Sequence, residues 1–283
     1  MNQPIKIGIP SKGRLAEQAT SLLNQAGLSF RRQNRSLFAR VSQLPIDIAF
    51  LRTDDIPILC DEGAIDLGIT GQDLVEESQA TVTQRLRLGV GNCRLSICVP
   101  SSFQGGVGDL KNQNIATSFP NTTHLFLAEH NTAARIVELS GSVEVMIQLG
   151  VADAIVDLVE TGSTLAANDL KILCDIGTYE TVLIQRKGLD SNDLVNRVVR
   201  RLEGVVIARS YSLLEFNIAR DLLKQAEAIT PGFDSPTVSA LEDETMCAVR
   251  VMVSKREIIE KMEHLESLGA SAIIQVPISN CRL

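Results

Sequence analysis

The sequence predicts an α/β protein with two lobes and a smaller C-terminal domain, and three observations support this prediction. Strand-like and helix-like segments alternate along most of the chain. Gly63–Ile69 and Gly150–Val156 follow one common pattern. Beyond residue 208 the order changes to strand, helix, strand, strand, helix, strand. The alternation favours mainly parallel sheets, in which ligands gather at the carboxyl ends of the strands.

The composition is typical of a globular protein with a large core. The chain has 283 residues, of which 45% are hydrophobic, enough for two or three domains. A net charge of −7 and the absence of Trp argue against a general nucleic-acid binder. No apolar run reaches the roughly 20 residues of a membrane helix, and no signal peptide precedes the first strand. We therefore expect a cytoplasmic protein that binds neither nucleic acid nor membranes.

The cysteines and histidines form no recognisable reactive or metal-binding motif. The six Cys residues include no Cys-x-x-Cys pair, and His124, His130 and His264 are too far apart for a zinc site. The cysteines are expected to be small core residues in a reducing compartment. No Ser-His-Asp or Cys-His nucleophile pattern is found.

The chain is expected to begin with a strand, a loop and a helix. Ile5–Ile9 alternates like a strand, Ser11–Arg14 is polar, and Leu15–Ala26 has apolar residues at helical spacing before a glycine. A buried strand at Ile46–Leu51 then precedes a short helix at Asp54–Glu62.

The two similar segments predict two similar lobes. Gly63–Ile69 and Gly150–Val156 share the order Gly-apolar-x-Asp-apolar-x-apolar, as expected where a helix ends and a strand begins. Two such units suggest lobes that face each other across a cleft, as in bilobal binding proteins. A common turn pattern without common ancestry explains the similarity equally well, so the repeat bears on architecture alone.

The C-terminal domain has a different order of elements. After a helix at Asn192–Ile207, we expect strands at Tyr211–Asn217, Thr237–Leu241, Met246–Val253 and Ala272–Ile278, with helices at Arg220–Ala228 and Lys255–Leu268. This β-α-β-β-α-β order is the ferredoxin-like plan. Small domains of this kind often bind effectors in enzymes, which is an analogy.

The most informative segment is Ala154–Leu165. An apolar strand carries Asp157 and ends before Glu160, the loop Thr161–Thr164 follows, and a helix is expected next. N–H groups at a helix start, joined by hydroxyls, suit a phosphate dianion, whereas the acids suit a ribose diol or Mg²⁺. A phosphoribosyl donor requires this combination. A polar loop in which one hydroxyl only caps a helix is the simpler interpretation.

Seven segments together resemble one known family: Ser11–Leu15, Leu51–Pro57, Asp66–Asp73, Gly91–Leu95, Ala116–Asn121, Leu139–Glu144 and Asp157–Leu165. In order and spacing they are similar to ATP phosphoribosyltransferase over nearly the whole chain. Ser235–Val238 resembles the long, histidine-regulated form. The resemblance implies a two-lobed, periplasmic-binding-protein-like catalytic region followed by the ferredoxin-like domain.

The same resemblance implies the domain boundaries. Catalytic lobe I would comprise residues 1–92 and 178–208, and lobe II residues 93–177 with the phosphoribosyl-donor motif. The regulatory domain would comprise residues 209–283.

The family's activity is the first step of L-histidine biosynthesis. By resemblance, N1 of the ATP adenine attacks C1′ of 5-phosphoribosyl 1-pyrophosphate, which gives N1-(5-phospho-β-D-ribosyl)-ATP and pyrophosphate. The substrate supplies the nucleophile, so no nucleophilic side chain is needed. Mg²⁺ as cofactor, histidine as feedback inhibitor and a homo-oligomer, from dimer to hexamer, are further implications.

Residue roles carry over at the matching positions. Glu144 and Asp157 are the candidate catalytic residues. The candidate donor-binding residues are Asp157, Glu160, Thr161, Gly162, Ser163 and Thr164, and the candidate ATP-binding residues are Lys12, Arg14, Arg52, Asp73 and Phe119. The resemblance assigns no metal ligand.

Several candidates also have simpler interpretations. Glu144 is expected in the first turn of a helix that begins near Ser142, where an acid complements the helix dipole. An ion pair of Arg52 with a neighbouring aspartate is as consistent with the sequence as substrate binding. Phe119 beside a proline suits the core equally well.

The histidine site would use Asn217, Thr237 and the backbone of Ala272. In the family pattern Asp occupies the position of Asn217, so the loss of charge is expected to weaken histidine binding. As strand-end residues, the three also have a purely structural interpretation.

A second class of function stays open from the sequence. A two-lobed protein of this kind would also serve as a cytosolic small-molecule-binding or effector-sensing protein without catalysis. Formation of pyrophosphate from ATP, the donor and Mg²⁺ distinguishes the two.

Overall fold

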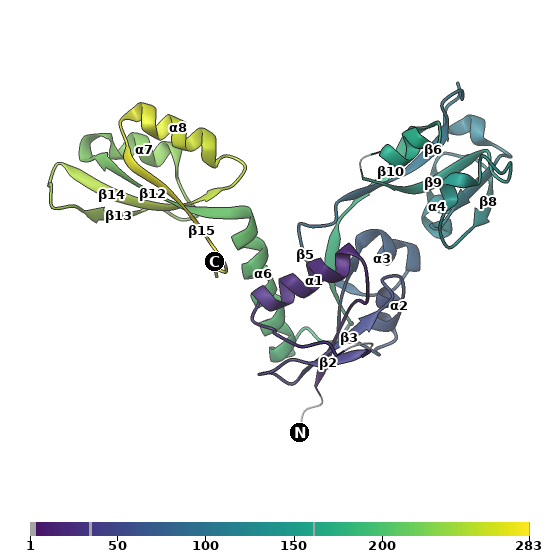
Figure 1. Cartoon of the computed structure of the whole chain (residues 1–283), viewed down its shortest axis with the longest axis horizontal. Coiled ribbons are helices and arrows are strands. Elements are labelled where there is room, and N and C mark those ends of the chain that lie inside the picture. The colour runs from purple at the N-terminus through teal and green to yellow at the C-terminus, as the bar shows by residue number, and fades with distance from the viewer. Residues whose placement is uncertain (1–3, 34–35, 161, 283) are drawn as a thin grey trace. The chain divides into compact units, whose positions relative to one another are not determined.

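A computed structural model describes residues 4–33, 36–160 and 162–282. The chain forms two compact units, Met1–Ser21 with Leu28–Asn196, and Leu22–Gly27 with Arg197–Leu283. Two of the three boundaries fall within helices, α1 (Arg14–Gln25) and α6 (Asp193–Ser210), which Figure 1 labels, and the third follows α1 at Gly27. In the described ranges, no helix has both the length and the apolar character needed to cross a bilayer.

The first sheet has six strands in the order β2-β3-β1-β4-β11-β5. Its strands are β1 (Ile5–Pro10), β2 (Phe38–Arg40), β3 (Ile46–Leu51), β4 (Leu67–Gly71), β5 (Thr83–Arg87) and β11 (Thr181–Gln185). Helices α1, α2 (Asp55–Asp61) and α3 (Gln72–Ser78) belong to the same part of the chain. The expected strands at Ile5–Ile9 and Ile46–Leu51 and the helix at Leu15–Ala26 are therefore present within a residue of their expected ends.

The second sheet has five strands in the order β10-β6-β9-β7-β8. They are β6 (Cys93–Pro100), β7 (Asn114–Thr117), β8 (Arg135–Glu138), β9 (Ala154–Val159) and β10 (Leu170–Tyr179). The helical segments here are η1 (Val107–Leu110), α4 (Pro120–Glu129), η2 (Val143–Val145) and α5 (Ser163–Ala167).

The two sheets share one strand arrangement. The order β3-β1-β4-β11-β5 in the first corresponds to β8-β7-β9-β6-β10 in the second. In each, three neighbouring strands are parallel and the next two pairings are antiparallel. The expectation of mainly parallel sheets is thus wrong, because strands that cross between the lobes enter each sheet in the opposite direction. The expected two-lobed α/β fold is confirmed.

The sequence repeat marks equivalent turns in the two lobes. Each turn begins at a glycine with positive φ, 76° and 67°. A carboxylate oxygen of Asp66 accepts from the N–H of Lys6 at 2.8 Å, and one of Asp153 accepts from the N–H of Asn114 at 2.9 Å. The N–H of each aspartate donates to the carbonyl of the same neighbour, at 2.9 and 2.8 Å. The repeated Asp therefore ties β4 to β1 and β9 to β7, which explains why one pattern occurs twice.

The helix expected to begin near Ser142 is present, but only as a short 3₁₀ helix. Gly141 and Ser142 have φ values of 147° and 53°, so the backbone turns sharply there. Only the three-residue 3₁₀ turn η2 follows, and it carries Glu144.

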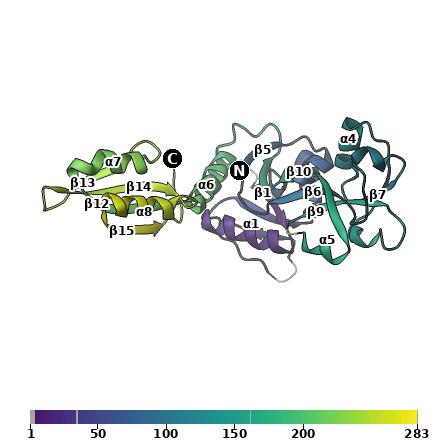
Figure 2. The ribbon, with the colours of Figure 1, turned by 90° about the horizontal axis from the view of Figure 1, so that it is seen from above.

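The C-terminal sheet is antiparallel, in the order β13-β14-β12-β15. Its elements are β12 (Tyr211–Ala219), η3 (Arg220–Leu222), α7 (Leu223–Ile229), β13 (Thr237–Ala240), β14 (Met246–Ser254), α8 (Ile258–Leu268) and β15 (Ser271–Pro277). Alternate residues of β12, including Leu214 and Phe216, are buried with residues of α7 and α8. Figures 1 and 2 show both helices on the same face of the sheet. The ferredoxin-like prediction is confirmed.

Two short segments carry the chain between the first and second sheets. Residues 88–92 join β5 to β6, and Glu180 joins β10 to β11. The N–H of Leu88 donates to the Thr181 carbonyl and the N–H of Thr181 to the Val90 carbonyl, both at 2.9 Å. The Glu180 carboxylate accepts from the N–H of Gly89 at 3.1 Å. The two crossing segments are therefore bonded to each other.

A carboxylate from α3 also holds the start of α4. Glu77 accepts from the N–H groups of Asn121 and Thr122, each at 2.9 Å, and from the Thr122 hydroxyl at 2.8 Å. A negative charge at a helix N-terminus is stabilising, so this contact fixes α4 beside α3.

Replacing Asp153 tests the role of the repeated turn. Asp153→Ala should lower the free energy of unfolding by about 1 kcal/mol, because it removes an exposed hydrogen bond to a charged acceptor. Asp153→Asn keeps a side-chain oxygen and should lose less. Urea unfolding followed by circular dichroism measures both, and an Ala variant as stable as the unmodified protein would show that the carboxylate does not fix the turn.

Candidate active site

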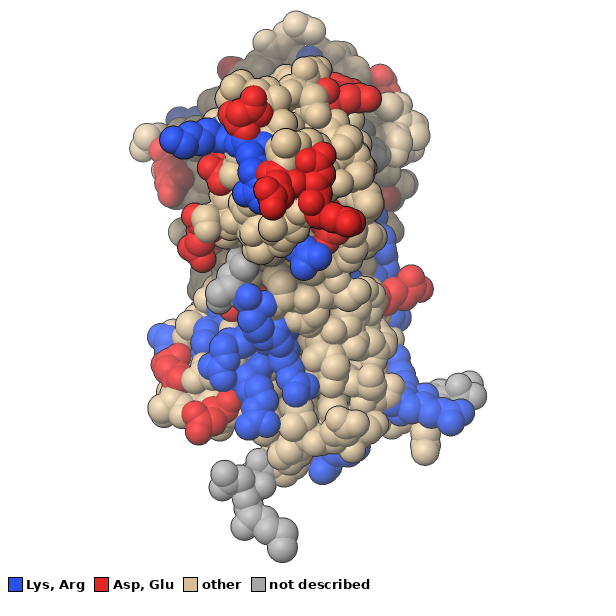
Figure 3. Space-filling model, turned by 90° about the vertical axis from the view of Figure 1, so that its left-hand side faces the viewer, with Lys and Arg blue, Asp and Glu red and all other residues tan. Residues whose placement is uncertain are grey.

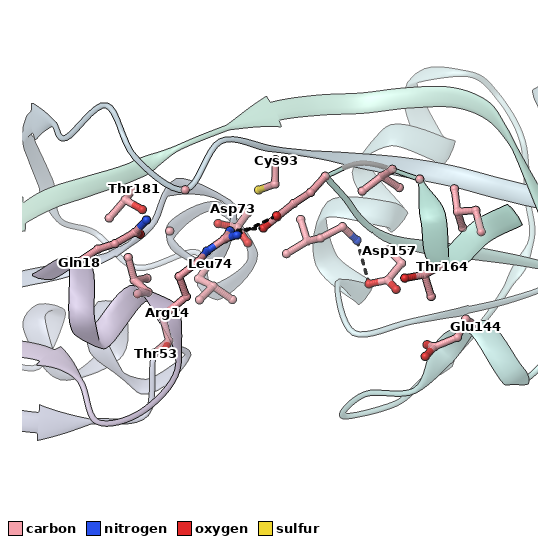
Figure 4. A pocket seen from close by; sticks show the side chains of 18 residues that line it. Arg14, Gln18, Thr53, Asp73, Leu74, Cys93, Glu144, Asp157, Thr164 and Thr181 are labelled. Carbon is pink, nitrogen blue, oxygen red and sulfur yellow. Dashed lines mark hydrogen bonds and ion pairs between the residues drawn. The ribbon is translucent and has the colours of Figure 1, made fainter. Parts of the chain in front are cut away.

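One cavity of about 610 Å³ is lined from both lobes. The residues from the first lobe include Arg14, Leu15, Gln18, Thr53, Asp73 and Leu74, and those from the second include Glu144, Asp157, Glu160, Gly162 and Thr164. Figure 4 shows Arg14, Gln18 and Thr53 toward one end and Glu144, Asp157 and Thr164 toward the other. The structure thus brings together both predicted catalytic carboxylates and part of the predicted ATP-binding set.

Asp157 lies on β9 and enters the cavity from a half-buried position. Burial is the main cause that raises the pKa of its carboxyl, and the charge of Glu144 raises it further. A hydrogen bond of 2.8 Å from the N–H of Leu158 to Asp157 Oδ1 opposes this shift. Both carboxylates line the same cavity, and the negative charge of Glu144 disfavours the ionised form of Asp157.

The loop after β9 leads into the short helix α5. Gly162 has φ 77°, which a residue with a side chain adopts only with strain. Thr164 lines the cavity, and its carbonyl accepts from Asn168 Nδ2 at 2.8 Å. Ser163 begins α5 and is not among the described lining residues, and Thr161 lies outside the described residues.

Arg14 and Glu160 form an ion pair across the cavity. Arg14 Nη1 donates to Glu160 Oε2 at 3.1 Å, and Nη2 donates to Oε1. Glu160 raises the pKa of the guanidinium, first through these hydrogen bonds. The side chains are 61% and 47% exposed, so the pair is a weak one that a ligand phosphate can replace.

Asp73 is a nearly buried acid at the same cavity. It lies in the first turn of α3, and its pKa is raised chiefly by burial, against hydrogen bonds from backbone N–H groups including that of Leu74. A Cβ at Gly71 would collide with Asp73 Oδ1. Gly71 therefore leaves room for this carboxylate to fold back over the helix start.

Lys12 and Arg52 line a separate hollow of about 410 Å³. Thr53 and Leu74 line both this hollow and the main cavity, so the two are adjacent. Arg52 Nη2 donates to Asp54 Oδ2 at 2.8 Å, and this partner raises the Arg52 pKa. The ion-pair interpretation of Arg52 thus fits the structure.

Phe119 lies in the core of the second lobe. It is 5% exposed, does not appear among the described residues of either hollow, and its N–H donates to Thr117 Oγ1 at 2.9 Å. The structure does not bring Phe119 to the cavity, and its simpler interpretation as a core residue fits the burial.

Gln18, Thr53, Cys93 and Thr181 line the cavity but were missed from the sequence. Gln18 is detectable, because it follows Arg14 by one turn and so shares its helix face. Thr181 enters only through the pairing of crossing segments far apart in sequence, and nothing local marks it. Burial raises the pKa of the Cys93 thiol to about 11, which keeps it protonated.

The three predicted histidine-site residues lie together on the C-terminal sheet. Asn217, Thr237 and Ala272 line one hollow of about 270 Å³. Glu215 and Arg250 line it too, and Arg250 Nε donates to Glu215 Oε1 at 2.7 Å. The hollow thus offers both a carboxylate and a guanidinium.

Sequence comparisons agree with this architecture. The HisG family profile, described as ATP phosphoribosyltransferase, matches residues 52–204, and the HisG C-terminal domain matches residues 208–280. An ATP phosphoribosyltransferase of Rhodopirellula baltica is 62% identical over 99% of this chain and 94% of its own. One of Saccharopolyspora erythraea is 41% identical over 99% of this chain and 100% of its own.

Solved structures give the same fold. The ATP phosphoribosyl transferase of the HisG:HisZ complex from Thermotoga maritima has a TM-score of 0.64 and 29% identity, covering 71% of this chain and 98% of its own. The crystal structure of Tv2483 bound to L-arginine has a TM-score of 0.50 and 16% identity, covering 71% of this chain and 84% of its own, a likeness of fold alone.

The fold, the cavity and these matches define a transferase of histidine biosynthesis. The chain belongs to the ATP phosphoribosyltransferase family, in the long form that carries the C-terminal domain. The expected enzyme class is thereby confirmed, and the alternative of a binding protein without catalysis loses its support.

The raised pKa of Asp157 predicts a dependence of stability on pH. The fold disfavours its ionised form, so its contribution to stability is full below the unfolded pKa of about 3.9 and is lost as pH rises through the raised value. Asp157→Asn is uncharged and can accept the same backbone bond. It should therefore unfold at higher urea than the unmodified protein at pH 7, with a smaller difference at pH 4.

Activity and a control complete this test. Asp157→Asn should lose at least about tenfold in kcat/KM despite the gain in stability. As a control, Asp234→Asn at an exposed position of the C-terminal domain should leave the urea unfolding midpoint unchanged at both pH 7 and pH 4. If Asp157→Asn were less stable than the unmodified protein at pH 7, the contacts of the Asp157 carboxylate would contribute more to stability than the burial of its charge costs.

Proposed function

We propose that the protein transfers the 5-phosphoribosyl group of 5-phosphoribosyl 1-pyrophosphate to N1 of ATP. The products are N1-(5-phospho-β-D-ribosyl)-ATP and pyrophosphate, in the first step of L-histidine biosynthesis. The observation that carries this proposal is one cavity lined by Asp157, Glu144, Gly162 and Thr164 from one lobe and by Arg14 from the other.

The donor binds against the second lobe. The start of α5 and the Thr164 hydroxyl face the 5-phosphate, with Thr161 and Ser163 assigned to the same group from the sequence. Asp157 and Glu160 accept from the ribose hydroxyls, because carboxylates repel phosphate and suit a diol. With the 5-phosphate and the ribose hydroxyls bound in this way, C1′ would lie near the two predicted catalytic carboxylates, Glu144 and Asp157.

The chemical step needs charge stabilisation rather than a protein nucleophile. As the bond from C1′ to pyrophosphate breaks, positive charge develops on the ribose ring, and N1 of ATP supplies the electron pair for the new bond. Glu144 and Asp157 are negative groups fixed beside this centre, so they stabilise the charge as it forms. Holding two anionic substrates in one cavity supplies much of the remaining rate.

Magnesium fits the donor set of this cavity. Among the described residues no three His, Cys, Asp or Glu side chains form a metal-binding group. Mg²⁺ is usually held by one or two carboxylates together with substrate phosphates, and Glu144 and Asp157 are two interacting carboxylates of this kind. When bound, the ion neutralises charge on the departing pyrophosphate.

Three cations of the first lobe bind phosphates. Arg14 lines the main cavity, and Lys12 and Arg52 line the adjacent hollow. Arg14 would exchange its exposed partner Glu160 for a phosphate, and Arg52 would exchange Asp54. Asp73 lies at the same end of the main cavity, and its negative charge would disfavour a phosphate placed directly beside it.

The remaining assignments concern regulation, assembly and location. Residues 1–92 with 178–208 and residues 93–177 serve as the two catalytic lobes, and residues 209–283 as the regulatory domain, where histidine inhibits. We propose a cytoplasmic homo-oligomer without nucleic-acid or membrane partners. The net charge of −7 supports the absence of a nucleic-acid partner. Figure 3 shows Asp and Glu beside Lys and Arg in both the upper and the lower part of one face.

The reaction itself is directly testable. Pyrophosphate should appear only when ATP, 5-phosphoribosyl 1-pyrophosphate and Mg²⁺ are all present, because ATP supplies the attacking nitrogen. An inorganic pyrophosphatase that draws the equilibrium forward, followed by phosphate detection, provides the measurement. Glu144→Gln should lower this rate by about tenfold or more, since it removes one stabilising charge.

Two outcomes would contradict the reaction. Pyrophosphate released from the donor at the same rate without ATP would indicate hydrolysis. A product with the ribosyl group on another position of the nucleotide, found by NMR, would reject N1 as the acceptor.

The histidine site is tested by restoring a charge. Asn217→Asp adds a carboxylate that can bind the histidine ammonium, so inhibition should need about tenfold less histidine. Asn217→Ala and Glu215→Gln each remove an acceptor and should weaken inhibition. Calorimetric titration and inhibition curves measure these changes. Equal inhibition of all variants would place histidine elsewhere.

A further inference from the structure

We propose that the amide of Gln18 recognises the N6 and N7 atoms of the ATP adenine and thereby leaves N1 free to attack the donor. This inference rests on the proposed function, since it specifies how the acceptor substrate is read. No part of the family resemblance assigned a role to this residue.

The position of Gln18 follows from helix geometry. It lies on α1, one turn beyond Arg14 and Leu15, and all three line the main cavity. Its side chain is half-buried. Figure 4 shows it at the end of the cavity opposite Glu144 and Thr164, where the first lobe supplies the walls. An adenine bound at the Gln18 end of the cavity can direct one edge of its ring to α1 and another edge toward Glu144 and Asp157.

The chemistry of the reaction restricts how adenine is held. N1 must present its lone pair to C1′, so a protein hydrogen bond to N1 would block the attack. The N6 amino group donates and N7 accepts, side by side on another edge of the ring. A glutamine amide has an acceptor oxygen and a donor nitrogen at matching spacing, the pairing that proteins use to read adenine in nucleic acids.

The other polar groups at this end do not match that edge. The Asp73 carboxylate is an acceptor only, and N–H groups at the start of α3 already bind it. Thr53 and Thr181 each offer one hydroxyl oxygen, which cannot span two ring atoms as an amide does. In the described part of the chain, no hydrogen bond engages the Gln18 amide. Leu15 and Leu74 add apolar surface for the ring faces.

This contact also predicts selectivity against other purines. Guanine and hypoxanthine carry an oxygen acceptor at position 6 beside the N7 acceptor. In either orientation of the amide, its oxygen then faces an acceptor and one hydrogen bond is lost. ATP should therefore be preferred over ITP and GTP by the same contact that leaves N1 exposed.

The test pairs a variant with a modified substrate. Gln18→Met keeps the length of the side chain but removes both amide groups, and 7-deaza-ATP lacks the N7 acceptor. The unmodified protein should use 7-deaza-ATP with a kcat/KM about tenfold below that for ATP. Gln18→Met should lower kcat/KM for ATP by about tenfold or more, and should no longer distinguish the two nucleotides. The KM for the donor should stay within about twofold.

A control and a second variant separate recognition from folding. Glu17→Met lies next along α1 at an exposed position outside the cavity and should leave both nucleotide constants unchanged. Gln18→Glu keeps the acceptor for N6 but not the donor for N7, so it should also lose discrimination against 7-deaza-ATP. Circular dichroism checks that each variant is folded.

The outcomes are distinct. Equal use of ATP and 7-deaza-ATP by the unmodified protein, or full discrimination in Gln18→Met, would overturn the role of Gln18 while the transferase activity stands. Absence of any donor-dependent turnover of ATP by the unmodified protein would instead overturn the proposed function.

Discussion

The candidate site depends on the hydrogen bonds that join the two crossing segments of the first compact unit. Leu88 and Thr181 are bonded through their backbones, and the Glu180 carboxylate closes the same junction on Gly89. Asp157 on β9 and Arg14 at the start of α1 lie on different sheets, yet they line one cavity. These bonds therefore help to set the separation of the side chains that the two lobes bring to the cavity.

The charged groups of the cavity are divided unequally between the lobes. The carboxylates Glu144, Asp157 and Glu160 come from the second lobe, whereas the first lobe supplies Arg14 and the carboxylate Asp73. Arg14 pairs with Glu160, and this exposed contact satisfies both groups at little energetic gain. For Asp157, in contrast, burial disfavours the ionised form. A positive centre or ion between the carboxylates would relieve that cost, which links the electrostatics of the cavity to the chemistry proposed for it.

Local patterns predicted much of the fold, and contacts between distant segments account for what they missed. Alternation and turn residues placed β1, β3 and α1 closely, and the repeated Asp of the two turns proved to have a structural cause. Strand direction was not predictable, because it depends on where the crossing strands β6 and β11 insert. In the site, the loop after β9 was recognised from its hydroxyls and glycine. Thr181 was missed because only tertiary pairing brings it to the cavity. Phe119 was a candidate because of the motif around it, but the structure buries it in the core.

Helix α1 belongs to both compact units, and this has a consequence for how the chain is made. Its first turn lines the cavity, while Leu22–Gly27 belongs to the unit that contains the C-terminal domain. There the Gln25 side chain accepts from Arg209 Nη2 at 2.9 Å, and its carbonyl accepts from Asn280 Nδ2 at 3.4 Å, across 255 positions of sequence. During synthesis the N-terminal helix emerges first, but the groups that hold its end emerge last. The far end of α1 is therefore fixed only after the last residues of the chain have been made.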